Sequence, residues 1–174
     1  MTTRRGFLLG AAGMAAGVTG LAAGGVYAVR AEAGAGTGEG FAVAKTEEEW
    51  RKVLTEDQFA VLREEATEPP FSSPLNDEKR EGVFKCAGCG NPLYSSEHKY
   101  DSGTGWPSFW RPVRDDAVGY ERDWKLLFPR TEVHCARCGG HQGHVFDDGP
   151  PPTGKRHCIN GIAMTFEPGA SATG

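Results

Sequence analysis

The feature that most restricts how this chain can fold is a duplicated cysteine motif. The pattern C-x-x-C-G occurs at Cys86–Gly90 and again at Cys135–Gly139. Two residues between the cysteines let both sulfurs turn toward one ion, and the glycine that follows permits a turn with positive φ. We therefore predict a structural zinc site that clamps two distant hairpins, with Cys86, Cys89, Cys135 and Cys138 as ligands. Two local disulfides are the alternative in an oxidising compartment.

The frequency of turn residues favours a β-rich domain. The 174-residue chain contains 25 Gly and 11 Pro, and 39% of its residues are hydrophobic. This composition disfavours a helical bundle but is sufficient for a packed core. Short runs bounded by Gly, Pro or Asp indicate strands in antiparallel sheets. These runs are Gly82–Lys85, Trp124–Phe128, Glu132–His134, His144–Phe146 and Ile159–Phe166.

Helical patterns are confined to the start of the domain. Thr46 and Thr55 each begin a capping box, with Glu49 and Gln58 as the third helical residues. Apolar residues follow each box at helical spacing, so we predict two short helices at about residues 46–65. Glu68-Pro69-Pro70 then ends the helical region. Residues 147–154 are rich in Pro and Gly and predict a rigid loop.

The first 33 residues form a leader that we exclude from the fold. Arg4 and Arg5 precede the uncharged residues 6–29, and Thr3–Leu8 resembles a twin-arginine export signal. Small residues permit cleavage after Ala28 or Ala33. The alternative is an uncleaved membrane anchor, because glycines recur at alternating spacings of four and three. These are Gly6, Gly10, Gly13, Gly17, Gly20 and Gly24.

The sequence indicates four parts of the chain. We expect an export signal or anchor at 1–33, a flexible spacer at 34–45, one domain at 46–168 and a tail at 169–174. The formal net charge is −4 and becomes more negative without the basic leader. Such a domain is poorly suited to neutralise phosphates, so we expect no nucleic-acid partner. A membrane partner is expected only if the leader is retained.

Cys158 is left over once four cysteines are assigned to the metal. A lone cysteine is by default a buried, inert residue. Here Lys155, Arg156 and His157 precede it and Asn160 follows, a polar and cationic setting that favours the thiolate. An odd cysteine accompanied by His and Asn is a candidate nucleophile. Two histidines just after the second motif, His141 and His144, are candidate partners, although structural roles explain them equally well.

An aromatic cluster follows the first motif at Gly103–Trp110. It contains Trp106 between Gly105 and Pro107, with Phe109 close behind. Core packing near a chain reversal would explain these residues. A tryptophan held between Gly and Pro can also present a rigid apolar wall to a ligand.

Together these motifs resemble the B-type peptide methionine sulfoxide reductases, which act on the R epimer of the sulfoxide. The resemblance covers about Thr46–Pro168. It rests on both cysteine motifs and on three further blocks of sequence, which are Thr67–Phe71, Tyr100–Phe109 and His141–Asn160. It implies a mainly β fold of two small antiparallel sheets, β-tent-like, with short N-terminal helices and a structural zinc away from the reaction.

The resemblance also implies roles for individual residues. Cys158 would attack the sulfoxide sulfur and become a sulfenic acid, the first rung of cysteine oxidation. His144 and His141 would handle the proton, and Asn160 would help to orient them. The expected substrate-binding residues are Trp106, Phe109 and Arg156, with Trp106 as the hydrophobic wall and Arg156 also stabilising the thiolate. The implied role is protein repair in oxidative stress.

Three residues depart from the family pattern. Many members carry a resolving cysteine in the segment where this chain has Thr104. We therefore expect an external, thioredoxin-like dithiol to reduce the sulfenic acid. His157 stands where Tyr or Phe is usual, and Gly161 replaces a common Ser.

Three other classes of protein compete with this interpretation. A non-enzymatic zinc-ribbon module would leave Cys158, Asn160 and Trp106 unexplained. A zinc hydrolase needs an open coordination position, which four thiolates close. A thioredoxin-like disulfide exchanger needs its C-x-x-C within a βαβ unit, which these short strand-like runs do not provide.

Overall fold

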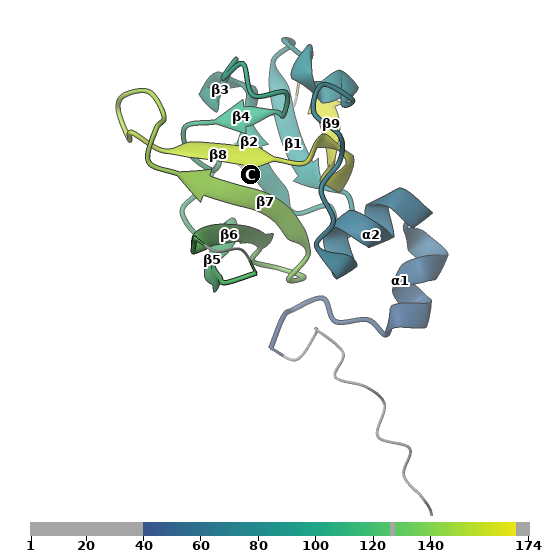
Figure 1. The fold of residues 1–174 in the computed structure, drawn as a ribbon. Coiled ribbons are helices and arrows are strands. Elements are labelled where there is room, and N and C mark those ends of the chain that lie inside the picture. Colours follow the sequence, from purple (N-terminus) through teal and green to yellow (C-terminus); the bar gives the residue numbers. More distant parts are fainter. Residues whose placement is uncertain (1–39, 126–127, 170–174) are drawn as a thin grey trace, which may run out of the picture. The chain divides into compact units, whose positions relative to one another are not determined.

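The computed structural model describes residues 40–125 and 128–169, and these form a domain of two antiparallel sheets with short helices (Figure 1). One sheet has three strands in the order β2-β1-β9. The other has six, in the order β3-β4-β8-β7-β6-β5. The predicted mainly β class is therefore confirmed. The predicted leader, half of the spacer and most of the tail lie outside the described residues.

The elements follow one another closely along the chain. The two α-helices are α1, Glu47–Val53, and α2, Glu56–Glu64, and the short 3-10 helices are η1, Pro74–Asn76, η2, Ser96–His98, and η3, Gly161–Ala163. The strands are β1, Gly82–Cys86, β2, Pro92–Ser95, β3, Lys99–Tyr100, β4, Ser108–Phe109, β5, Val118–Asp123, β6, Arg130–Cys135, β7, His141–Phe146, β8, Arg156–Ile159, and β9, Met164–Pro168.

Both predicted capping boxes are present. The side chains of Thr46 and Thr55 accept hydrogen bonds from the third backbone N–H of α1 and α2, and each of those third residues bonds back. The helices bury Trp50, Phe59 and Leu62 in the core that the two sheets share. The helices are thereby positioned beside the cysteine motifs, since Leu62 lies close to both Gly88 and Gly140.

Strand β8 occupies an interior position in the six-stranded sheet. It pairs with β4 on one side and with β7 on the other, and it runs antiparallel to both (Figure 1). On its core side, Ile159 is fully buried together with Phe84, Tyr94 and Phe109. A residue on β8 is therefore held by hydrogen-bonded neighbours on both sides, which fixes Cys158 more firmly than a loop would.

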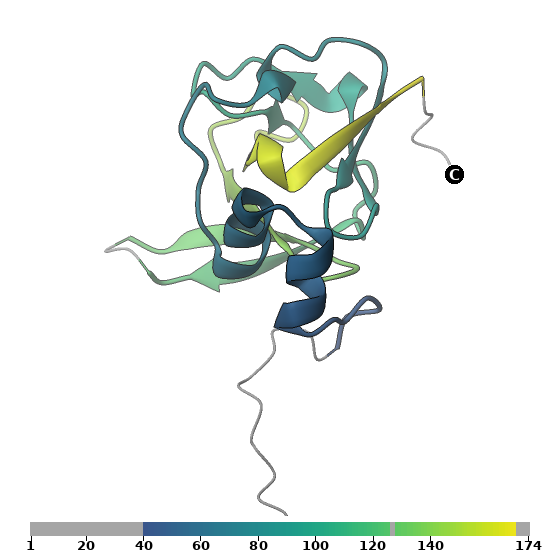
Figure 2. The same cartoon turned by 90° about the vertical axis from the view of Figure 1, so that its right-hand side faces the viewer.

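Two of the predicted strands are wrong. Of the predicted strand Trp124–Phe128, the described residues Trp124, Lys125 and Phe128 lie outside both strands, between β5 and β6 of the hairpin that extends to the left in Figure 2. The carboxylate of Asp123 accepts a hydrogen bond from the backbone N–H of Lys125, and this turn ends β5. Ile159–Phe166 is divided by η3 into the ends of two strands in different sheets. Residues 147–154 form a loop, as predicted.

Among residues 40–125 and 128–169 there is no helix with the length and hydropathy needed to cross a membrane.

Candidate active site and metal centre

The four cysteines of the two motifs converge on one point. The Sγ atoms of Cys86 and Cys138 are 3.7 Å apart, and those of Cys89 and Cys135 are 3.6 Å apart. Zinc–sulfur bonds of about 2.3 Å in a tetrahedron place the sulfurs about 3.8 Å from one another. All four ligand atoms lie within 4.8 Å of one another, so the cluster could hold a zinc ion.

The local backbone shapes this cluster. Gly90 and Gly139 adopt φ values of 71° and 67°, which is the turn conformation that the trailing glycines predict. The side-chain amides of Asn91 and Gln142 each point an N–H at a sulfur, at 3.6 Å. The closest sulfur pairs join different motifs, and all five cysteines, which lie within the described residues, are free thiols. The alternative of two local disulfides is therefore wrong.

Cys158 lies apart from this cluster, in a row of residues that crosses the six-stranded sheet. It pairs with Ser108 of β4 and with His144 of β7, and His144 in turn pairs with Glu132 of β6. Directly paired residues of an antiparallel sheet project from the same face. The register therefore places the thiol and the His144 imidazole side by side on one face.

Several groups act on the Cys158 thiol. Burial raises its pKa most, whereas the hydrogen bond with Thr104 and the guanidinium of Arg156 act to lower it, and the net result is a raised pKa. The sequence led us to expect that Lys155, Arg156 and His157 favour the thiolate, but of these three only Arg156 acts to lower the pKa of Cys158. Lys155 forms an ion pair with Asp147 instead, and His157 contacts Tyr94 on the opposite face.

Arg156 is shared between the thiol and a carboxylate. Its guanidinium donates two hydrogen bonds of 2.9 Å to Asp148 and lies 4.4 Å above the ring of Phe146. These contacts hold the side chain in place, with only 12% of it exposed. Arg156 acts to lower the pKa of Cys158, and Asp148 offsets part of that effect.

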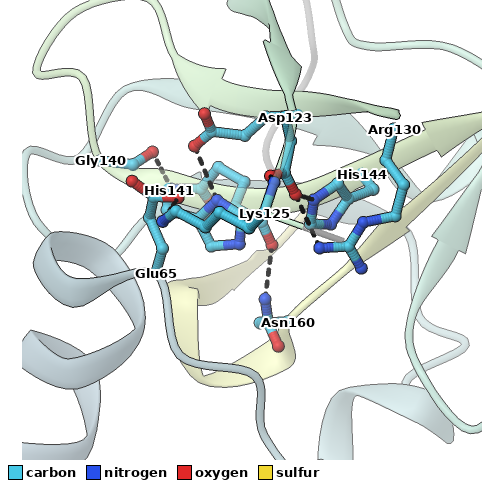
Figure 3. Close-up of polar contacts among 10 residues, drawn as sticks. Glu65, Asp123, Lys125, Arg130, Gly140, His141, His144 and Asn160 are labelled. Atoms are coloured by element: carbon cyan, nitrogen blue, oxygen red, sulfur yellow. Dashed lines mark hydrogen bonds and ion pairs between the residues drawn. The ribbon is translucent and has the colours of Figure 1, made fainter. Parts of the chain in front are cut away.

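His144 is held by a carboxylate that sequence reasoning missed. Its Nε2 lies 2.8 Å from Asp123, and the same carboxylate oxygen accepts a 2.6 Å hydrogen bond from Arg130 (Figure 3). Burial lowers the pKa of His144, and Asp123 only partly offsets this, so the imidazole is mainly neutral at pH 7. A neutral ring that donates from Nε2 has a basic Nδ1.

His141 lies beside His144, with ring centroids 5.4 Å apart. Its Nδ1 is 2.7 Å from the carboxylate of Glu132, while its buried Nε2 has no hydrogen-bond partner among the described residues. Burial acts to raise the pKa of Glu132, but His141 and the nearby histidines outweigh it and leave that pKa lowered. Both histidines are thus oriented by carboxylates from the β5–β6 hairpin.

The same hairpin is tied to α2. The ammonium group of Lys125 forms an ion pair with Glu65, the residue that caps the end of α2 (Figure 3). This contact joins the two elements on either side of His141 and His144. It is exposed to solvent, so its contribution to stability is at most about 1 kcal/mol.

Asn160 orients the histidines only indirectly. Its side-chain amide donates to the carbonyl of Gln142, and its oxygen accepts from the backbone N–H of Glu68 (Figure 3). Gln142 lies between the two histidines on β7. Asn160 therefore fixes the backbone that carries them.

Glu68 is a second residue that sequence reasoning did not single out. Its carboxylate accepts hydrogen bonds from the backbone N–H groups of Gly161 and Ile162, at 2.5 and 2.9 Å. Its carbonyl accepts from the indole N–H of Trp106 at 3.1 Å. One buried residue thus links the turn after Cys158 to the predicted substrate wall. The only sequence feature that could have pointed to Glu68 is its position within the block Thr67–Phe71, on which the family resemblance partly rests.

Trp106 and Phe109, both predicted to bind substrate, lie in different surroundings. Trp106 is half-buried and lines a cavity of about 410 Å³ together with Phe71, Tyr100 and Pro107. Phe109 is fully buried, stacks on Tyr94 with ring centroids 4.3 Å apart, and pairs with His157. It alternates with Ser108 on β4 and so faces the core. The expectation that Phe109 contacts substrate is therefore wrong.

The fold and the site define a class of protein: a domain of two antiparallel sheets in which four thiols could hold a metal, while a fifth lies on the strand paired with the one that carries two histidines. Comparison with known proteins gives the family. Residues 54–168 match the SelR domain family. The chain belongs to the MsrB family of peptide methionine sulfoxide reductases, which are oxidoreductases.

Relatives of the chain carry the name "Peptide methionine sulfoxide reductase MsrB". Those of Methanosarcina barkeri and Agrobacterium fabrum are 53% and 51% identical over 126 residues, covering 72% of this chain and 89% and 93% of the relatives. That of Bradyrhizobium diazoefficiens is 55% identical over 126 residues and is covered to 91%.

Proposed function

We propose that the protein reduces the R epimer of methionine sulfoxide in peptides and proteins to methionine, with Cys158 as the nucleophile. The observation that carries the proposal is the position of Cys158, which lies opposite His144 on paired strands while the other four cysteines form a separate cluster. The relatives named above carry this activity in their names. Protein repair under oxidative stress is the role that such chemistry would serve.

In the proposed reaction the sulfur of Cys158 attacks the sulfoxide sulfur. The sulfur–oxygen bond of the substrate breaks, the oxygen passes to Cys158, and methionine leaves. The cysteine is oxidised to a sulfenic acid and the sulfoxide is reduced by two electrons. The thiol proton ends on the transferred oxygen, so no further proton is consumed in this step.

The two histidines would move that proton. Because the pKa of Cys158 is raised, most of the enzyme carries a thiol at pH 7. The basic Nδ1 of a neutral His144 would accept the thiol proton and return it to the departing oxygen, with Asp123 stabilising the imidazolium that forms. His141 offers a buried Nε2 without a partner among the described residues, which we assign to the sulfoxide oxygen.

Trp106 is the proposed wall for the methyl group of the substrate. Its indole is fixed by the hydrogen bond to Glu68, so a half-buried apolar face is available to a ligand. Arg156 is the proposed stabiliser of the thiolate, and Asn160 keeps β7 in register with the turn that follows β8.

The sulfenic acid would be reduced from outside the domain. Thr104 lies 3.8 Å from the sulfur of Cys158, at the place where a resolving cysteine would stand. A thioredoxin-like dithiol would attack the sulfenic sulfur, release water and leave Cys158 reduced as the dithiol becomes a disulfide. A disulfide between Cys158 and a cysteine of the same chain after one turnover would contradict this step.

We assign a structural zinc to Cys86, Cys89, Cys135 and Cys138. Four thiolates complete a tetrahedral shell, so such an ion would stabilise the fold and would not bind substrate. For the leader we propose export by the twin-arginine route, with retention as a membrane anchor as the alternative. N-terminal sequencing of the protein from separated cell fractions distinguishes the two.

The test of the function compares the two sulfoxide epimers. The wild-type protein with dithiothreitol should reduce a methionine R-sulfoxide peptide and leave the S-sulfoxide peptide unchanged. Cys158→Ser should abolish turnover while keeping the metal and the fold. Turnover by the serine variant, or no turnover by metal-loaded wild type, would favour a non-enzymatic zinc-binding module.

A further inference from the structure

Three hydroxyl groups lie in a line that begins at the Cys158 sulfur. Thr104 Oγ1 is 3.8 Å from the sulfur, and Ser102 Oγ is 2.8 Å from Thr104. Ser108 Oγ is 2.7 Å from Ser102 and 3.1 Å from the carbonyl oxygen of Trp106. Each hydroxyl carries one proton, so the direction of one hydrogen bond in the line constrains the others.

Two arrangements satisfy this line. When Cys158 is a thiol, its proton points to Thr104, Thr104 donates to Ser102, Ser102 to Ser108, and Ser108 to the carbonyl of Trp106. When Cys158 is a thiolate, every proton reverses, so Ser108 donates to Ser102, Ser102 to Thr104, and Thr104 to the sulfur. Apart from the departure of the thiol proton, which the proposed function assigns to His144, only rotations about C–O bonds are needed.

We propose that Ser108, Ser102 and Thr104 form a reversible hydroxyl chain that follows the ionisation of Cys158, with Thr104 as the donor to the sulfur. Thr104 contacts the reacting atom and is therefore a catalytic residue, whereas Ser102 and Ser108 are positioning residues. The proposal deepens the proposed function, on which it rests, by naming what supports the nucleophile on the side away from His144.

Position and burial support this assignment. Ser108 is fully buried and pairs directly with Cys158, so its hydroxyl is held on the same face of the sheet. Ser102 and Thr104 are half-buried in the loop between β3 and β4. Hydrogen bonds to a charged sulfur are stronger than those to a neutral thiol, and aligned donors reinforce one another. The chain should therefore favour the thiolate.

Other groups also face the thiol and contribute to the pKa of Cys158 independently of the hydroxyl chain. Arg156, on the same strand, lowers the pKa of Cys158, and Asp148, which binds Arg156, raises it. His144 faces it from the neighbouring strand β7, and Tyr100 lies in the same row on β3, beyond β4. The charged residue in the loop of Thr104 is Asp101, whose carboxylate accepts from the backbone N–H of Gly103. The variants below leave all of these groups in place.

The experiment titrates Cys158 without any sulfoxide. Full-length protein is alkylated with iodoacetamide across a pH series, and the rate at Cys158 is followed by mass spectrometry of its peptide. Cys158→Ser reports alkylation of the other four cysteines. Because no sulfoxide is present, this measurement decides the inference even if the protein fails to reduce methionine sulfoxide, and that failure would count against the proposed function alone.

Three variants distinguish a connected chain of hydroxyl groups from a single contact between Thr104 and the sulfur. Thr104→Val keeps the shape, loses the hydroxyl and should raise the pKa of Cys158 by about one unit, which is about tenfold less thiolate below that pKa. Thr104→Ser restores the hydroxyl and should titrate within about 0.3 units of wild type. Ser102→Ala does not touch the sulfur, yet it should raise the pKa by about half a unit because the aligned donor is lost.

The matched control is Ser72→Ala, which removes an exposed hydroxyl that bonds the carbonyl of Pro69. It should leave the titration unchanged. A wild-type pKa in Thr104→Val would overturn the role of Thr104. A pKa in Thr104→Ser equal to that of Thr104→Val would show that shape is responsible. A wild-type pKa in Ser102→Ala would reduce the chain to one isolated hydrogen bond and overturn the proposal.

Discussion

Gly143 of β7 packs directly against the peptide carbonyl of Cys158 on β8. A Cβ atom at position 143 would overlap that carbonyl oxygen and the backbone of Ile159. The two strands can hold their register only because the side chain is absent. The position of the nucleophile therefore depends on a glycine that carries no chemistry of its own.

Gly143→Ala should displace β8 and with it Cys158. We expect a loss of about 1–3 kcal/mol in the free energy of unfolding from overpacking. We also expect a fall of about a hundredfold in kcat/KM if the nucleophile moves by about 1 Å. Urea unfolding and steady-state assays measure the two effects.

The control for this variant is Gly154→Ala. Gly154 has a positive φ of 69° but nothing within 4 Å of its Cβ position. The variant therefore introduces backbone strain without steric overlap. It should lose about 1 kcal/mol and retain activity. Equal losses in both variants would contradict the overlap with Cys158.

Glu68→Ala should damage the fold and the site together. The variant removes the carboxylate that accepts hydrogen bonds from the backbone N–H groups of Gly161 and Ile162. We expect the free energy of unfolding to fall by about 3 kcal/mol and KM to rise as the segment that holds Trp106 loosens. Tryptophan fluorescence and kinetics would follow the change. Glu56→Ala, in the exposed first turn of α2, is the matched control and should change the free energy of unfolding by less than about 1 kcal/mol.

His157 should make the protein sensitive to acid. Burial lowers its pKa to about 4, and the buried Tyr94 hydroxyl lies 3.2 Å from its Nδ1. The unfolded chain takes up the proton near pH 6.5 and the folded protein only near pH 4. Stability is therefore complete above about pH 6.5 and is lost as pH falls, by about 2 kcal/mol between pH 7 and pH 5.

His157→Phe should remove this pH dependence. The comparison uses the difference between unfolding free energies at pH 7 and pH 5 in each protein, so the loss of the Tyr94 contact, which is present at both pH values, cancels. If wild type and variant lose the same stability on acidification, His157 is not the group responsible. Ser72→Ala, which removes an exposed and uncharged hydroxyl, serves as the control.

Loss of one thiolate ligand should release the metal. Cys135→Ser is expected to lower bound zinc from one ion per chain to a small fraction of that and to lower Tm by about 10 °C or more, because metal binding is coupled to folding. Cys158→Ser should keep its zinc and its Tm. Elemental analysis and thermal unfolding test both, and zinc loss in Cys158→Ser would contradict the separation of the two sites.

Local patterns gave reliable predictions wherever the chain determines structure by itself. The capping boxes at Thr46 and Thr55 place both helices, because their hydrogen bonds close within four residues. The C-x-x-C-G motifs predict their turns for the same reason. In contrast, Trp124–Phe128 was predicted as a strand from its short apolar run. Its described residues lie between β5 and β6, where the side chain of Asp123 accepts a hydrogen bond from the backbone N–H of Lys125 and ends β5.

The amino-acid sequence by itself determined the four cysteines of the cluster and set the fifth apart from them, since residue type and spacing carry that information. Only the tertiary structure decided which carboxylates hold the two histidines and the turn after Cys158. Asp123, Glu132 and Glu68 are distant in sequence from the groups they bind and become their partners through strand pairing and the turn after β8. Phe109 faces the core because side chains alternate along β4 and Ser108, not Phe109, pairs with Cys158. That register depends on strand pairing, which no local pattern encodes.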